Sequence, residues 1–326
     1  MPQPALSEVP GFGALQVARP RQAELLPVPY FHVVFTLPQE LAHLGLQNPK
    51  QIYNLLFRAA SETLLTIAAD PQHLGASIGF LAVLHTWGQN LHLHPHLHCI
   101  VPGGGISPDG LRWIACRKNF FLPVRVLSRL FRKKFLKSLR SAFRRGELHF
   151  SGDLRCLTAP SAFQSLCQMA AHREWVVYAK PPFGGPERVL KYLARYTHRV
   201  TISNHRLRWL ENGNVRFAWK DYAHGNEMKD LTLDAVEFIR RFLLHVLPSG
   251  FVRIRQFGLL ANRVRKHKLE QCRALLAARQ PAITIDCHSS PEVNNEDRHR
   301  CPVCTLGRLI VIELLTAQPT PAQDTS

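Results

Sequence analysis

The chain of 326 residues lacks the features of a membrane or secreted protein. Charged residues interrupt every apolar run well short of the roughly 18 residues that a membrane-spanning helix needs. The N-terminus has no basic-then-apolar signal pattern. The eight cysteines have no regular spacing outside residues 301–304, which favours reduced thiols in a cytoplasmic protein over a disulfide framework. We therefore expect no membrane partner.

Acidic residues are also scarce. The 23 Asp and Glu residues stand against 41 Lys and Arg residues, which gives a net charge of +18 at pH 7. Such an excess predicts an anionic polymer as partner. The hydrophobic content of 46% is ample for a packed core, which excludes a disordered basic tail. The sequence carries no signal for an oligomeric state.

The most informative stretch is residues 91–98, which read LHLHPHLH. In an extended strand side chains alternate between the two faces, so the four histidines would project to one side and the leucines to the other. Neutral imidazole is a good ligand for divalent cations, and this density of histidines indicates a metal site. The alternative is a strand with a solvated polar face. The four residues are His92, His94, His96 and His98.

Apolar periodicity and turn residues divide the chain into mixed strands and helices. Short hairpin connections, such as the ENG turn at 211–213, outnumber βαβ units, which predicts an α+β fold. The expected strands are 30–37, 76–86, 91–101, 175–179, 199–203, 207–210, 214–219 and 251–256. The expected helices are 48–69, 124–145, 187–197, 231–246 and 259–277.

The expected helix at 124–145 is strongly basic, and its apolar positions keep helical spacing. Two interpretations stay open for it. It is either an amphipathic surface element with solvated charges or a surface that faces phosphates.

A second chemical pattern is KYLARYTHR at residues 191–199. Tyr192 and Tyr196 stand four residues apart, which on a helix puts both hydroxyls on one face. A phenol with a pKa of about 10 is a poor nucleophile until cations or a metal stabilise its anion. Tyrosines at this spacing are commonly packing residues, but the histidine cluster and the positive charge favour catalysis. The surrounding cations are Arg188, Lys191, Arg195 and Arg199.

Three segments in this order resemble a known family. They are HPHLHCIVPGGG at 94–105, YLARYTHRVTISNHRL at 192–207 and FIRRFLLHVLPSGFVRIRQFGLLANR at 238–263. The chain resembles the two-tyrosine rolling-circle transposases of bacterial insertion sequences, within the HUH endonuclease superfamily. The resemblance covers roughly residues 23–305. It implies a central, mostly antiparallel sheet that carries the histidine strand and is flanked by helices, in a bacterial, nucleoid-associated protein.

The resemblance also implies an activity. A divalent metal, Mg or Mn, is held by His96 and His98 and grips the scissile phosphate of single-stranded DNA at the element ends. Tyr192 or Tyr196 attacks that phosphate and leaves a 5′-phosphotyrosine and a free 3′-hydroxyl. The second tyrosine allows another cleavage and transfer before the first strand is released. The cations around the tyrosines would then bind DNA.

Two histidines are too few ligands for such a metal, so a third protein group should complete the site. His94 shares their expected face and is the first candidate, and Gln89 or Asn90 is the second choice. Pro95 fits poorly in a fully paired central strand. It therefore stays open whether residues 94 and 96 belong to one regularly paired strand.

The chain divides into four expected parts. Residues 1–22 form a flexible leader, 23–280 the catalytic domain, 281–316 a small zinc-knuckle segment and 317–326 a disordered tail. The knuckle rests on the CxxC pair Cys301 and Cys304, for which Cys287, His288 and His299 are candidate partners. A complete zinc ribbon would have two such pairs. It therefore stays open whether this segment binds structural zinc or binds no metal.

The leader departs from the family pattern, because members usually carry a cysteine-rich module ahead of this domain and residues 1–22 contain no cysteine. One alternative is therefore a decayed transposase that binds DNA without cleaving it. Another is a metallohydrolase that activates water. Asp109 is the only acidic residue between 71 and 146, which weighs against that second alternative.

Overall fold

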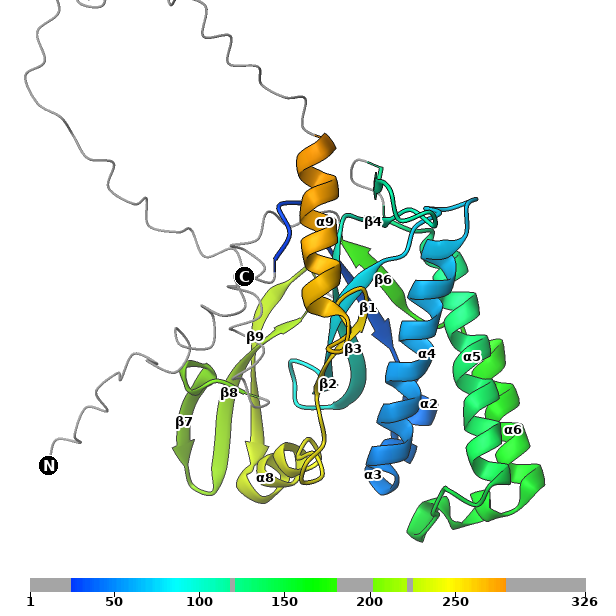
Figure 1. Cartoon of the computed structure of the whole chain (residues 1–326). Coiled ribbons are helices and arrows are strands. Elements are labelled where there is room, and N and C mark those ends of the chain that lie inside the picture. The colour runs from blue at the N-terminus through cyan, green and yellow to red at the C-terminus, as the bar shows by residue number, and fades with distance from the viewer. Residues whose placement is uncertain (1–24, 118–120, 181–201, 222–224, 280–326) are drawn as a thin grey trace, which may run out of the picture. The chain divides into compact units, whose positions relative to one another are not determined.

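The fold is built around one five-stranded antiparallel sheet (Figure 1). The computed structural model describes residues 25–117, 121–180, 202–221 and 225–279. Across the sheet the strand order is β10-β2-β3-β1-β6, so a strand from the end of the described chain lies at one edge. The strands are β1 (Tyr30–Thr36), β2 (Gly79–Trp87), β3 (Leu93–Pro102), β6 (Val177–Lys180) and β10 (Ile254–Gly258).

Helices cover one face of this sheet and form the main core with it (Figure 1). Strand alternation points Phe35 and Leu97 to this face, where both are fully buried. Phe35 packs edge-on against Phe131 of α5, with ring centroids 5.0 Å apart. The helices are α2 (Gln39–Ala42), α3 (Leu44–Gln47), α4 (Pro49–Ala69), α5 (Val124–Arg144) and α6 (Pro160–His172).

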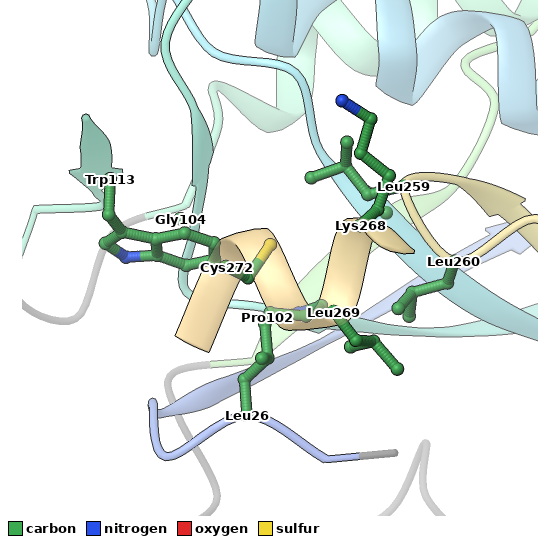
Figure 2. Close-up of a pocket in the computed structure, with 10 residues that line it drawn as sticks. Leu26, Pro102, Gly104, Trp113, Leu259, Leu260, Lys268, Leu269 and Cys272 are labelled. Carbon is green, nitrogen blue, oxygen red and sulfur yellow. The ribbon is translucent and has the colours of Figure 1, made fainter. Parts of the chain in front are cut away.

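A smaller core lies on the opposite face, where α9 (Arg265–Arg279) packs near the end of β3. The side chains there come from α9, from Leu26 and from Pro102, and they surround a cavity of about 10 Å³ (Figure 2). A space of that size holds one water molecule at most. This face is therefore only partly covered by apolar packing, and the histidine-bearing part of β3 continues beyond it.

A second sheet of three antiparallel strands is inserted between β6 and β10. It is followed by a short helix that begins at Asp234, whose carboxylate accepts hydrogen bonds from the backbone N–H groups of Val236 and Glu237. The elements are β7 (Leu207–Glu211), β8 (Asn214–Asp221), β9 (Glu227–Asp234) and α8 (Ala235–Leu243). A further two-stranded sheet pairs β4 (Gly104–Ile106) with β5 (Trp113–Ala115).

The structure confirms the α+β class with antiparallel sheets and most expected elements. The expected helix at 231–246 is wrong at its start, because residues 231–234 extend β9 and the Asp234 cap then begins the helix. Residues 202 and 203, expected in a strand, are not in one. The expected helix at 259–277 begins only at Arg265. The sequence reading missed α2, α3, α6, β4, β5 and β9. No helix in the described ranges is both long and apolar enough to cross a membrane.

Several predicted segments lie outside the described residues. They are the leader at 1–22, the helix at 187–197, the zinc-knuckle segment at 281–316 and the tail at 317–326. The domain boundaries drawn through them stay predictions.

Asn48 provides a test of this fold, because its buried side chain holds two chain segments together. Its Nδ2 donates to the His149 carbonyl at 2.9 Å and its Oδ1 accepts from the His149 N–H at 2.7 Å. Asn48→Ala should lower the free energy of unfolding by about 1–2 kcal/mol, because both backbone groups lose their partner. Urea unfolding at pH 7 measures this change.

Gln47→Ala is the matched control. Gln47 makes the same pair of bonds to Ser151, each 2.9 Å long, but Gln47 is only half-buried and Ser151 is exposed, so water can replace these bonds. This variant should lose less stability than Asn48→Ala. An equal loss would contradict the role given to burial.

Candidate metal centre

The candidate centre begins with the alternation of β3. Leu97 and Cys99 point into the main core and are fully buried, so His96 and His98 share the other face of the sheet. His92 is not part of this row, because it precedes the strand and follows Leu91, whose φ is 62°. The predicted face of four histidines therefore has three members on β3.

The neighbouring strand supplies a histidine that the sequence reading missed. In the antiparallel register of β2 and β3, His85 stands directly opposite His96. The ligand atoms of His85, His96 and His98 all lie within 4.8 Å of one another, and this group could hold a metal ion. We call these three residues the histidine group. His85 is 3% exposed and His98 is 9% exposed, so the group is largely shielded from water.

Hydrogen bonds engage one ring nitrogen of His96 and one of His98. His96 Nδ1 lies 2.6 Å from the His94 carbonyl oxygen, which only accepts, so Nδ1 carries the proton and Nε2 has the lone pair. His98 Nδ1 lies 2.7 Å from His32 Nε2, which engages that nitrogen and leaves His98 Nε2 for a ligand. Ring contacts of this kind fix the orientation of metal-binding histidines.

Burial keeps these imidazoles neutral, the form that binds metals. It lowers the pKa of His32 to about 4 and that of His96 to about 3. Burial also moves the pKa of His85 and of His98 well below 6.5. The positive charge of Lys180 lowers the pKa of His32 further. At His85 the charge of His96 lowers the pKa further, and that of Arg253 does so to a smaller extent. The group therefore combines uncharged nitrogen ligands with nearby positive charge.

The structure places the other predicted ligands around this group. His94 is exposed, its ring centroid lies 5.0 Å from that of His96, and it falls outside the histidine group. Gln89 and Asn90 lie in the turn before β3. As a third ligand, His94 stays a prediction beside the new candidate His85.

Pro95 has the effect on the ladder that its missing N–H predicts. Between the pairs His85–His96 and Trp87–Leu93 the register shifts by one residue, which is a bulge. On its other side the Pro95 carbonyl still accepts from the Leu37 N–H at 2.9 Å. The proline therefore interrupts the pairing with β2 and keeps the bond to the β1 side.

The inserted segment anchors the tip of the β2–β3 hairpin. His245 is buried, its Nε2 lies 3.1 Å from the Leu91 carbonyl and its Nδ1 lies 3.3 Å from the Thr86 hydroxyl. The Arg206 guanidinium donates to the Gln89 carbonyl. These contacts hold the hairpin that aligns His85 with His96.

The predicted nucleophiles and their cations lie outside the described residues. This applies to Tyr192, Tyr196, Arg188, Lys191, Arg195 and Arg199, and to the zinc candidates Cys287, His288, His299, Cys301 and Cys304. Their roles stay predictions.

Comparison with known proteins gives the family. Residues 79–268, more than half of the chain, match the family model described as "Putative transposase" (Y2_Tnp). The chain is 56% identical to "Putative transposase y4qJ" of Sinorhizobium fredii over 314 residues, which cover 94% of this chain and 79% of that relative. The chain belongs to this transposase family.

The resemblance to two-tyrosine transposases is thereby confirmed at the level of the family. A more distant relative of this transposase is the "Transposase for insertion sequence element IS801" of Pseudomonas savastanoi pv. phaseolicola. It is 29% identical over 284 residues, which cover 85% of this chain and 66% of that relative. No solved structure matches the chain. The matched range contains all three members of the histidine group.

The lowered pKa values predict acid sensitivity of the metal-free transposase. Between pH 6.5 and about 4 the unfolded histidines bind protons that the folded ones do not, so the free energy of unfolding falls as the pH falls. His32 alone should contribute a loss of roughly 2 kcal/mol by pH 5. Urea unfolding in a chelator at pH 7.5 and 5.0 measures it. His32→Gln should show a smaller difference between the two pH values, and an unchanged difference would refute the assignment.

The histidine group makes a second prediction, on metal affinity. His85→Ala should weaken Mn²⁺ binding at least about tenfold, because it removes one of three ligands. His94→Ala should leave the affinity nearly unchanged. The signal of free Mn²⁺ in electron paramagnetic resonance follows the titration, and Mn²⁺ avoids the thiols that would bind Zn²⁺. The reverse order of the two variants would restore His94 as the third ligand and remove His85.

Proposed function

We propose that this transposase cleaves and rejoins single-stranded DNA through a covalent phosphotyrosine, with the histidine group as its metal centre. The observation that carries the proposal is the buried group of three imidazoles on adjacent strands. The antiparallel sheet that presents it is consistent with an HUH-type fold. The relative named for IS801 supports a role at the ends of an insertion sequence.

The position of β6 supports the two tyrosines as nucleophiles. Its last residue, Lys180, stands opposite His32 in the register with β1, and His32 is hydrogen-bonded to His98. The chain therefore leaves the described sheet next to the histidine group, and Tyr192 follows 12 residues after Lys180. The chain is thus long enough to bring a tyrosine to a phosphate held there.

The proposed step exchanges one phosphodiester bond for another. The phenolic oxygen of Tyr192 or Tyr196 gives up its proton and bonds to phosphorus, the bond to the 3′-oxygen breaks, and that oxygen takes up a proton. A divalent metal, when bound, would polarise a non-bridging phosphate oxygen and neutralise its charge. The side chains of Arg188, Lys191, Arg195 and Arg199 would stabilise the phenolate and hold the strand. Strand transfer is the reverse reaction with a new 3′-hydroxyl.

The ligand set bears on which metal is used. Imidazole nitrogen suits transition metals, whereas Mg²⁺ prefers oxygen ligands and dehydrates reluctantly. Within the described residues no carboxylate joins the histidine group. Of the two candidates, we therefore favour Mn²⁺ over Mg²⁺ as the supporting ion. Structural Zn²⁺ in the separate cysteine knuckle stays an open prediction.

Tyrosine substitution tests the proposal. Wild-type protein with Mn²⁺ should form a covalent adduct with a single-stranded oligonucleotide that carries an element end, and little adduct with the fully paired duplex. The double variant Tyr192→Phe, Tyr196→Phe should form none, because packing is kept and both nucleophiles are removed. Denaturing gel electrophoresis with labelled DNA resolves the adduct.

Two controls separate this function from its alternatives. His96→Ala and His98→Ala should lose cleavage and keep most binding, because phosphate contacts elsewhere supply the nonspecific affinity. An adduct formed by the double tyrosine variant would contradict the proposal. Binding without any adduct in the wild type would favour a decayed, non-catalytic protein, and cleavage without an adduct would favour a metallohydrolase.

A further inference from the structure

A cavity of about 470 Å³ opens between α5 and α6. It belongs to the helical layer, which packs on the face of the sheet that carries Phe35 and Leu97. The histidine group is on the opposite face. The volume falls within the range of small-molecule and nucleotide sites, which is about 300–1,000 Å³. Neither the metal centre nor the tyrosines account for this cavity.

Three cations of α5 line the cavity, namely Lys137, Arg140 and Arg144. Their spacing of three and four residues puts them on one face of the helix. All three are exposed, and within the described ranges none forms an ion pair with a carboxylate. Elsewhere on the same helix Lys134 pairs with Glu62 at 3.3 Å. The row that faces the cavity therefore keeps its full charge for a ligand.

The aromatic and amide side chains that line the cavity are suited to a nucleobase. Phe143 and Phe163 stack with ring centroids 3.9 Å apart and an angle of 8° between the planes. Phe163 is buried, and Phe143 is half-buried and lines the cavity with it. From α6, Gln164 and Gln168 add amides that both donate and accept hydrogen bonds. A flat apolar surface beside amides and cations is the combination that single-stranded DNA sites use.

We propose that this cavity binds a segment of single-stranded DNA outside the metal centre. The backbone follows the cationic row of α5 and one unstacked base enters the cavity against Phe143. From Lys137 to Arg144 the helix rises about 10 Å. A rigid duplex cannot place a base between two helices. The inference rests on the proposed function only in that DNA is the substrate.

A binding experiment in a chelator tests the cavity without any cleavage chemistry. Fluorescence anisotropy with a labelled 20-nucleotide dT strand gives the affinity over a series of salt concentrations. The double variant Lys137→Gln, Arg144→Gln should bind about tenfold more weakly at 100 mM salt. Its log–log salt slope should be shallower by about 1.4, because two phosphate contacts are lost. Arg140 is left in place because its guanidinium interacts with the buried Cys167.

The matched control removes two charges from another part of α5. Arg125 and Arg129 are exposed and do not line the cavity. Arg125→Gln, Arg129→Gln should lose less than about twofold in affinity. An equal loss in the two double variants would overturn the proposal, because the effect would then be that of net charge alone. An absence of strand binding by the wild type would overturn it as well.

Photocrosslinking supplies the second readout. A strand carrying 5-bromodeoxyuridine should crosslink to peptides that contain Phe143 or residues 160–168, and Phe143→Leu should reduce that yield. An abasic strand of the same length should compete more weakly than the dT strand. Crosslinks confined to other peptides, or equal competition, would overturn the base-binding cavity. Cavity crosslinks without any tyrosine adduct would leave this inference standing while the proposed cleavage failed.

Discussion

The register between β2 and β3 is the constraint on which the candidate centre depends. It sets His85 opposite His96, and a slip of one residue would turn every side chain of the strand to the other face. The register is fixed by the apolar residues of the same strands, since Leu97 and Cys99 are fully buried against the helices. A well-packed core on one face thus holds buried imidazoles, which are costly to desolvate, on the other.

Local sequence patterns predicted most of the long helices and strands and two of the three grouped histidines, because the alternation of β3 depends on residues that are adjacent in sequence. They could not supply His85, which reaches the group through pairing across a hairpin whose register also depends on the bulge at Pro95. The helix expected from Leu231 fails for a related reason. Residues 231–234 are recruited into β9 by pairing with β8, and only the Asp234 cap then allows a helix to begin.

The five-stranded sheet separates two kinds of chemistry. One face presents neutral nitrogen ligands flanked by Lys180 and Arg253, and the helical layer on the other face presents a cationic row beside stacked aromatic rings. The cations that give the net charge of +18 therefore act differently on the two sides of the sheet. Charge near the histidines lowers their proton affinity, whereas charge on α5 is available to an external anion.

The sheet order also has a consequence for synthesis on the ribosome. The histidine-bearing strands are complete once β3 has emerged, but β2 lacks its outer neighbour until β10 is made roughly 150 residues later. At elongation speeds of about 5–20 residues per second, that interval is on the order of ten to thirty seconds. During this time β2 has an unpaired edge next to the histidine group, and an unpaired strand edge is a surface that can pair with another chain.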